Sequence, residues 1–266
     1  MTIRIGTAFV ASAVLVLSAC NNSETGTSDH TGGADGDNVE TYQVATDNNF
    51  VPFEFIDLET NELTGFDIEL MKAIAEEAGF AVEFQQMDFS GALSGIEQGS
   101  YDAAINGMTI TEERKENIDF SDPYYESGLV LTVAEEDDVI ESIDDITSST
   151  KVATRLSSTS QTYLEDNTEA QVDAYPEITE AYQALLAGHV DAVLYDMPNV
   201  QYFMQQQGEG QMKMVGERLT GEEYGIAFPK GSDLVEPVNE ALATLMENGT
   251  YGDIYEKYFG ERPEGM

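Results

Sequence analysis

Short strand-like runs alternate with amphipathic helical stretches along the first half of the chain. Residues 42–46 and 81–87 have the composition of strands, and residues 66–78 have the apolar periodicity of a helix that Gly79 ends. The alternation continues with a predicted helix at residues 92–98 and predicted strands at residues 101–105 and 129–133. This order is typical of an α/β fold with a largely parallel sheet.

A second unit begins after Val133, where the acidic stretch 135–145 interrupts the alternation. Beyond it, strands are predicted at residues 151–154, 170–175 and 191–195, and helices at residues 160–164 and 178–187. The last predicted elements are a strand at residues 224–228 and helices at residues 234–248 and 251–259. The sequence therefore predicts two α/β units, for which 266 residues suffice.

The segment of residues 103–125 combines a buried strand with a helix start. An apolar run ends at Ile105, Asn106 and Gly107 form a turn, and Thr111 followed by two glutamates is typical of a helix N-terminus. Arg114 falls in the first helical turn, so its guanidinium can reach back toward unpaired backbone N–H groups at the end of the strand. This predicts a carboxylate site. The alternative is a surface arginine that pairs with neighbouring glutamates.

The chain is strongly acidic, with 51 Asp and Glu against 11 Lys and Arg and a net charge of −40. Such a surface repels phosphate backbones, which excludes nucleic acid as a partner. Salt reduces the mutual repulsion of the carboxylates, because the Debye length falls to about 3 Å at 1 M. We therefore hypothesise a salt-rich habitat.

The N-terminus has the layout of an export signal. Residues 1–20 contain Arg4, an apolar run and the ending Leu-Ser-Ala-Cys, and Cys20 is the only cysteine of the chain. The ending resembles a bacterial lipobox, which implies a lipid-modified Cys20; the alternative is an ordinary signal peptide that contains a cysteine. Residues 21–40 are almost devoid of apolar side chains, which is typical of a flexible tether. No disulfide framework is expected.

Motifs between Tyr42 and Phe259 carry a family resemblance. They are A-T-D-N-N-F-V-P-F-E-F at 45–55, G-F-D-I-E-L at 65–70, M-D-F-S-G at 87–91, N-G-M-T-I-T-E-E-R at 106–114, I-D-F-S-D-P-Y-Y at 118–125, Y-G-I-A-F-P-K-G-S at 224–232 and N-G-T-Y at 248–251. In this order and spacing they resemble the polar amino acid binding proteins of ABC transporters, the glutamine-binding proteins among them, which form solute-binding protein family 3.

This resemblance implies a two-lobed periplasmic-binding-protein fold of type II. Each lobe would be a mixed sheet flanked by helices, and two hinge strands would join the lobes. Lobe one would comprise residues 41–125 and 225–266, and lobe two residues 129–219. The hinge would lie at residues 126–128 and 220–224, with the ligand in the cleft between the lobes.

The resemblance also implies partners for the two charged groups that every amino acid carries. Arg114 would hold the α-carboxylate bidentately, assisted by Thr109 and by Thr159 of lobe two. The Gly107 carbonyl, the Thr109 hydroxyl and the Asp196 carboxylate would accept the α-ammonium group. The alternative for Asp196 is the capping of a helix that begins before Pro198.

The remaining matched positions concern the ligand's side chain. Phe50 and Phe89 would sandwich its aliphatic stem, although without the resemblance both would be interpreted as core residues. Asp47 and Arg155 would read its polar end; the alternative for Arg155 is a solvated residue at a helix start. The sequence departs from the glutamine-binding pattern at four predicted ligand-binding positions, namely Asn106, Arg155, Thr159 and Tyr195.

Glutamine is the favoured ligand. Asp47 and Arg155 offer one acceptor and one donor to a side-chain amide while they balance each other's charge. Glutamate would be repelled by Asp47 unless Arg155 dominated, and lysine would be repelled by Arg155. Because the arginine guanidinium presents more hydrogen-bond donors than the lysine ammonium group, glutamate or a bulkier polar amino acid stays an alternative ligand.

Catalysis has little support in the sequence. Only two histidines occur, His30 in the tether and His189 after a predicted helix, and no metal or phosphate-loop motif is present. We therefore expect no cofactor and no enzyme, with a dehydratase-like enzyme on the same fold as the rival. The expected protein is a periplasmic, lipid-anchored monomer that closes on its ligand and delivers it to an ABC permease.

Overall fold

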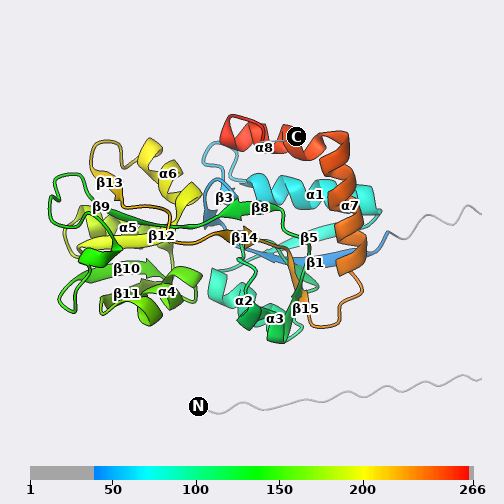
Figure 1. Cartoon of the computed structure of the whole chain (residues 1–266). Helices are drawn as coiled ribbons and strands as arrows, with labels where there is room; N and C mark the ends of the chain where they lie inside the picture. Colours follow the sequence, from blue (N-terminus) through cyan, green and yellow to red (C-terminus); the bar gives the residue numbers. More distant parts are fainter. Residues whose placement is uncertain (1–38, 264–266) are drawn as a thin grey trace, which may run out of the picture. The chain divides into compact units, whose positions relative to one another are not determined.

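The computed structural model describes residues 39–263 and arranges them in two lobes (Figure 1). The predicted signal peptide with Cys20 lies outside the described residues, as does the tether except for its last two residues. Residues 264–266 also lie outside them. Within residues 39–263, no helix has the length and apolar character needed to cross a membrane.

Lobe one is built on a five-stranded sheet with the strand order β5-β1-β6-β15-β7. Its strands are β1 (Thr41–Thr46), β5 (Ala81–Gln86), β6 (Ala103–Ala104), β7 (Ile118–Phe120) and β15 (Ala227–Pro229). The first three run parallel, whereas β15 is antiparallel to β6 and β7. The order of elements predicted a largely parallel sheet and the family resemblance a mixed one. The observed sheet is mixed, because the chain returns from lobe two through β15.

Helices cover both faces of this sheet. On one side lie α1 (Phe66–Ala78), α7 (Val235–Asn248) and α8 (Thr250–Phe259), and on the other lie α2 (Phe89–Glu97) and α3 (Glu112–Asn117) (Figure 1). The predicted end of α1 is confirmed, since Gly79 has a left-handed φ of 80°. Helix α2 begins at Phe89 and not at residue 92, because the Asp88 carboxylate caps it by accepting the Gly91 N–H at 2.8 Å.

Lobe two is a second five-stranded sheet with the order β11-β10-β12-β9-β13. Its strands are β9 (Leu129–Ala134), β10 (Lys151–Arg155), β11 (Gln171–Tyr175), β12 (Ala192–Asp196) and β13 (Met212–Val215). Strands β11, β10 and β12 are parallel, and β9 and β13 are antiparallel to their neighbours. The flanking helices are α4 (Thr159–Asn167), α5 (Ile178–Leu186) and α6 (Met197–Gln206), and a 3-10 turn at Ile143–Asp145 lies in the acidic connection.

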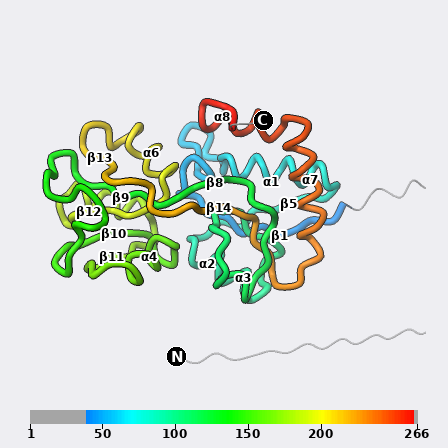
Figure 2. Tube along the Cα trace, viewed as in Figure 1, coloured from blue at the N-terminus to red at the C-terminus, as the bar shows by residue number. Residues whose placement is uncertain are grey.

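Two antiparallel crossings join the lobes, β8 (Tyr125–Ser127) and β14 (Glu222–Tyr224) (Figure 2). The single strand predicted at residues 224–228 is wrong, because β14 ends at Tyr224 and β15 begins at Ala227. Between them the Gly225 N–H donates to the Met108 carbonyl and the Ile226 N–H to the Ser121 hydroxyl. Those bonds turn the chain from the crossing into the lobe-one sheet.

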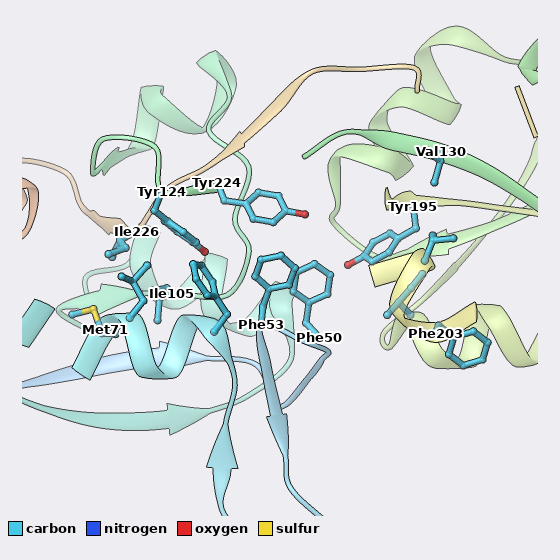
Figure 3. Close-up of a cluster of buried hydrophobic side chains, with 14 of the residues drawn as sticks. Phe50, Phe53, Met71, Ile105, Tyr124, Val130, Tyr195, Phe203, Tyr224 and Ile226 are labelled. Atoms are coloured by element: carbon cyan, nitrogen blue, oxygen red, sulfur yellow. The ribbon is translucent and has the colours of Figure 1, made fainter. Parts of the chain in front are cut away.

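A small sheet and an aromatic cluster lie on the lobe-one side of the crossings. The sheet consists of β2 (Asn49–Phe50), β3 (Glu54–Ile56) and β4 (Leu63–Thr64). The cluster includes Phe50, Phe53, Tyr124 and Tyr224, all almost fully buried, and Figure 3 shows the Tyr224 hydroxyl pointing toward lobe two. Phe50 of this cluster contacts Tyr195 of lobe two, so the aromatic packing extends across the lobes.

Candidate functional site

A small cavity of about 10 Å³, enough for a single water molecule, lies between the lobes. Its lining combines aromatic rings with many polar groups, as small-molecule sites do. The lining residues are Phe89, Asn106, Gly107, Thr109, Arg114, Arg155, Ser158, Thr159, Tyr195 and Asp196. All predicted ligand-binding residues except Asp47 and Phe50 are among them, and Ser158 is an addition.

Strand ends explain why these residues meet. Asp47 follows β1, Asn106 and Gly107 follow β6, Arg155 ends β10 and Asp196 ends β12. These strands belong to the parallel parts of the two sheets, and ligands of open α/β sheets gather at the carboxyl ends of such strands. The chain topology therefore concentrates polar side chains at the facing edges of the lobes.

The predicted helix start at Thr111 is confirmed, and it positions Arg114. The Thr111 hydroxyl accepts the Arg114 N–H at 3.1 Å, and the Arg114 guanidinium donates back to the Thr109 carbonyl at 2.8 Å. Its other end donates to the Ser157 carbonyl of lobe two at 3.2 Å, and it lies 5.3 Å from the centre of the Phe89 ring. Arg114 therefore reaches from α3 across to lobe two.

The alternative of a surface ion pair is not observed for Arg114. Within residues 39–263, its guanidinium forms no salt bridge, unlike that of Arg262. Burial lowers the pKa of Arg114, and the carboxylates of Glu222 and Asp196 counteract this. A guanidinium remains charged at any relevant pH, so the cavity contains a cation available to an anionic ligand group.

Arg155 and Asp47 form a fully buried ion pair between the lobes, with side chains that are 1% and 0% exposed. Arg155 also donates to the Tyr195 hydroxyl at 3.4 Å, and its guanidinium lies 5.2 Å from the centre of the Phe89 ring. Burial alone would lower the pKa of Arg155, but Tyr195 and Asp47 raise it above its ordinary value. Arg155 is therefore not the solvated residue of the alternative interpretation.

Asp47 and Phe50, the two predicted site residues that do not line the cavity, contact residues that do. The other Asp47 oxygen accepts the backbone N–H groups of Asn48 and Asn49, which fixes the carboxylate that faces Arg155. The Phe50 ring packs edge-on against Tyr195 with ring centres 5.9 Å apart. Phe50 also lies so close under Gly107 that a Cβ there would be 2.3 Å from the ring.

Two further carboxylates, Asp196 and Glu222, lie on the side of the site near the crossing strands. Asp196 is 5% exposed and accepts a hydrogen bond from the Tyr224 hydroxyl, and its side chain makes no capping bond to α6. Burial and the charge of Glu222 raise the pKa of Asp196 to about 8. Glu222 itself accepts the Thr109 hydroxyl at 3.1 Å, and burial raises its pKa.

Glu222 and Ser158 are site residues that the sequence analysis missed. Glu222 lies on a crossing strand and is one of 51 acidic residues, so nothing in the sequence singled it out. Ser158 caps α4: its hydroxyl accepts the Gln161 N–H and donates to the Arg155 carbonyl. The signal for Ser158 was a helix-capping pattern next to Thr159.

The Asn106 side chain is 1% exposed, and neither its oxygen nor its nitrogen has a hydrogen-bond partner within residues 39–263. Buried amides are normally paired, because an unpaired polar group costs about 1–3 kcal/mol. Asn106 lines the cavity, where a bound ligand or a water molecule could pair with its amide.

Glu222→Gln is expected to flatten the pH dependence of ligand binding. If Asp196 must be ionised to pair with a ligand ammonium group, wild-type affinity rises with pH up to about 8, by at most about tenfold per pH unit. Removing the Glu222 charge lowers the pKa of Asp196 and weakens this slope. Calorimetric titrations at pH 6, 7 and 8 measure it, with the exposed neighbour variant Glu223→Gln as the control. Equal slopes in both variants would contradict the coupling.

Comparison with known proteins decides the family. The sequence pattern of the bacterial extracellular solute-binding proteins, family 3, matches residues 42–261. The chain belongs to this family. Its sequence is similar to a probable histidine-binding protein of Neisseria gonorrhoeae, with 31% identity over 96% of this chain and 94% of that protein. It is also similar to the glutamine-binding protein GlnH of Bacillus subtilis, with 34% identity over 77% of this chain and 76% of that protein.

Solved family structures confirm the predicted fold class. An ancestral arginine-binding protein has a TM-score of 0.77 and 44% identity, covering 83% of this chain and 98% of its own. Its structures have been solved with arginine and with glutamine bound. Family membership confirms the predicted relationship to extracellular solute-binding proteins. The relatives are named for binding different amino acids, so the identity of the ligand has to come from the site itself.

Proposed function

We propose that this protein captures a polar amino acid, preferentially L-glutamine, and delivers it to an ABC permease. The proposal rests on which polar and charged side chains at the cavity already have a partner and which do not. Asp47 and Arg155 neutralise each other, Asn106 lacks a partner, and Arg114 is free of ion pairs within the described residues. A ligand with a carboxylate and a neutral amide complements this set.

The ligand's common groups would be held as follows. Arg114 takes the α-carboxylate, with the hydroxyls of Thr109 and Thr159 beside it. The Gly107 carbonyl and an ionised Asp196 accept the α-ammonium group, and the Phe89 ring packs on the aliphatic stem.

The charge balance favours glutamine over charged side chains. A zwitterion neutralises Arg114 and Asp196, and the remaining buried pair is already neutral. A glutamate side chain would compete with Asp47 for Arg155, and a lysine or arginine side chain would face the Arg155 guanidinium in a desolvated site. Asn106 can both donate to and accept from a carboxamide.

Contacts across the cleft support binding by closure. Besides Arg114 and Asp47, Asn49 of lobe one also contacts lobe two. Its side-chain amide donates to Glu177 and Thr179 at 3.1 Å each. We propose that residues 126–128 and 220–224 form the hinge between lobe one, residues 41–125 and 225–266, and lobe two, residues 129–219.

A melting-shift screen of the twenty amino acids tests the proposal. Glutamine is expected to raise the melting temperature most, because a ligand that binds only the folded state stabilises it by mass action. A larger shift with a cationic amino acid would overturn the proposed specificity. A flat screen accompanied by turnover of an amino acid precursor would favour the enzyme alternative.

We also propose that Cys20 carries a lipid anchor that keeps the protein at the outer side of the cell membrane. Two or more acyl chains hold firmly, whereas one holds weakly. Cys20→Ala is therefore expected to move the expressed protein from the membrane fraction to the soluble fraction. Retention of this variant on membranes would contradict the anchor.

The acidity leads to a proposed dependence on salt. With a net charge of −40, repulsion destabilises the folded chain at low ionic strength, and molar salt screens it. The melting temperature is expected to rise between low and molar NaCl. An unchanged melting temperature would contradict adaptation to a salt-rich habitat.

A further inference from the structure

Two carboxyl groups lie buried beneath the Gly107 turn and take no part in the proposed ligand contacts. Glu54 is on β3 and Asp67 is near the start of α1, and both are 0% exposed. Two adjacent buried carboxylates would repel each other strongly, so their pairing needs a physical explanation.

The hydrogen bonds of Asp67 fall on one of its two oxygens. That oxygen accepts the Gly107 N–H at 2.9 Å and the Tyr124 hydroxyl at 2.8 Å. The other Asp67 oxygen and both Glu54 oxygens have no partner within residues 39–263 if both groups are ionised. A proton on Glu54, donated to the free Asp67 oxygen, satisfies one oxygen of each group.

The surroundings favour this shared proton. Burial raises the pKa of Glu54 well above its usual range, and the neighbouring charges of Asp67 and Asp47 raise it further, against a smaller opposing effect of Arg155. Burial raises the pKa of Asp67 to about 6, although the bonds from Tyr124, Gly107 and Glu54 stabilise its ionised form. These effects favour a pair that shares one proton and carries one negative charge.

Gly107 is the residue through which this pair can act on the cavity. Its φ of 59° is left-handed, and the Phe50 ring lies where a side chain would project. The Asp67 carboxylate holds the N–H of Gly107, and Gly107 also lines the cavity. An acceptor that fixes this N–H also limits how the backbone at Gly107 can turn toward the ligand.

We propose that Asp67, the ionised member of a pair in which Glu54 holds the shared proton, is a positioning residue. It holds Gly107 in place and sets a fixed negative charge behind the ammonium end of the amino-acid site. This rests on the proposed function, since the Gly107 carbonyl is taken as an ammonium acceptor. Apart from each other, the charged or titratable groups near the pair are Asp47, Arg155, Tyr124, Tyr125 and Tyr251.

Three full-chain variants test the proposal. Asp67→Asn removes the charge and is expected to weaken glutamine binding about tenfold, the usual size for a bond to a charged group. Glu54→Gln replaces the shared proton by an amide donor and is expected to leave the Kd within about twofold. Tyr124→Phe is the comparison variant, because it removes the other donor to the same Asp67 oxygen and leaves the bond between Asp67 and the Gly107 N–H in place.

Thermal melts without ligand test the shared proton independently of any ligand. The folded state holds a proton that the unfolded chain releases above its ordinary carboxyl pKa, so this pair makes stability fall as pH rises toward its raised folded pKa. Between pH 6 and 9 the melting temperature of Glu54→Gln should therefore fall less steeply than that of the wild type. This arm holds even if Asp67→Asn does not fold.

Each result supports or overturns a defined part. Wild-type affinity in Asp67→Asn, or an equal loss in Tyr124→Phe, would overturn the positioning role. Equal melting slopes in the wild type and Glu54→Gln would overturn the shared proton. If no amino acid bound the wild-type protein, the proposed function would fail and the positioning role with it, while the melting slopes would still decide the shared proton.

Discussion

Arg114→Ala is expected to weaken amino-acid binding by about 2–5 kcal/mol, or at least roughly thirtyfold in Kd. The variant would leave the ligand's carboxylate in a closed cavity without its bidentate partner. The Phe89 ring would also lose one of its two cation contacts and keep the one to Arg155. Calorimetric titration with glutamine measures the loss.

The control for this variant is Arg262→Ala. Arg262 lies in the same lobe but pairs with Asp253 and Glu256 on the surface, where ion pairs contribute little. Its removal should leave the Kd unchanged. Unchanged affinity in Arg114→Ala itself would rule out the assigned carboxylate site.

Arg155→Met is expected to cost about 3–5 kcal/mol of the free energy of closure, because Asp47 would be left buried and unpaired. The two residues lie on different lobes, so the penalty applies when the cleft closes and not when each lobe folds. Affinity should therefore fall sharply, while the ligand-free melting temperature changes little. Calorimetry and thermal melts of the same preparation separate the two effects.

The double variant Asp47→Asn with Arg155→Met tests the cause of this loss. The amide introduced at position 47 can still accept the backbone N–H groups that Asp47 accepts, and it leaves no unpaired charge in the closed cleft. The double variant should therefore bind better than Arg155→Met alone. Equal affinities would show that the unpaired charge is not the cause of the loss.

The sequence predicted the helices and strands well where local signals coincide with packing. Thr111 as a cap and Gly79 as a left-handed stop act within one helical turn, so both ends were correct. The break between Tyr224 and Ala227 was missed because it depends on bonds to Met108 and Ser121, which are distant in sequence. Such turns are set by tertiary contacts and have no local periodicity.

The candidate site shows the same division. Family motifs predicted that Arg114, Arg155 and Asp196 share one site, and the structure gathers them around one cavity. Glu222 was missed because its importance comes from burial beside Thr109, which composition cannot reveal in so acidic a chain. The unpartnered amide of Asn106 could likewise be recognised only once its surroundings were known.

The central claim is that a neutral-amide amino acid fills the cavity between Arg114 and the Asp47–Arg155 pair. Calorimetric titration of the wild-type protein with glutamine, glutamate, arginine and lysine tests it most directly. We expect one-to-one binding of glutamine at least about tenfold tighter than that of the other three, a difference of about 1.4 kcal/mol. Tight binding of arginine or lysine with no heat from glutamine would contradict the assignment of the side-chain end of the site.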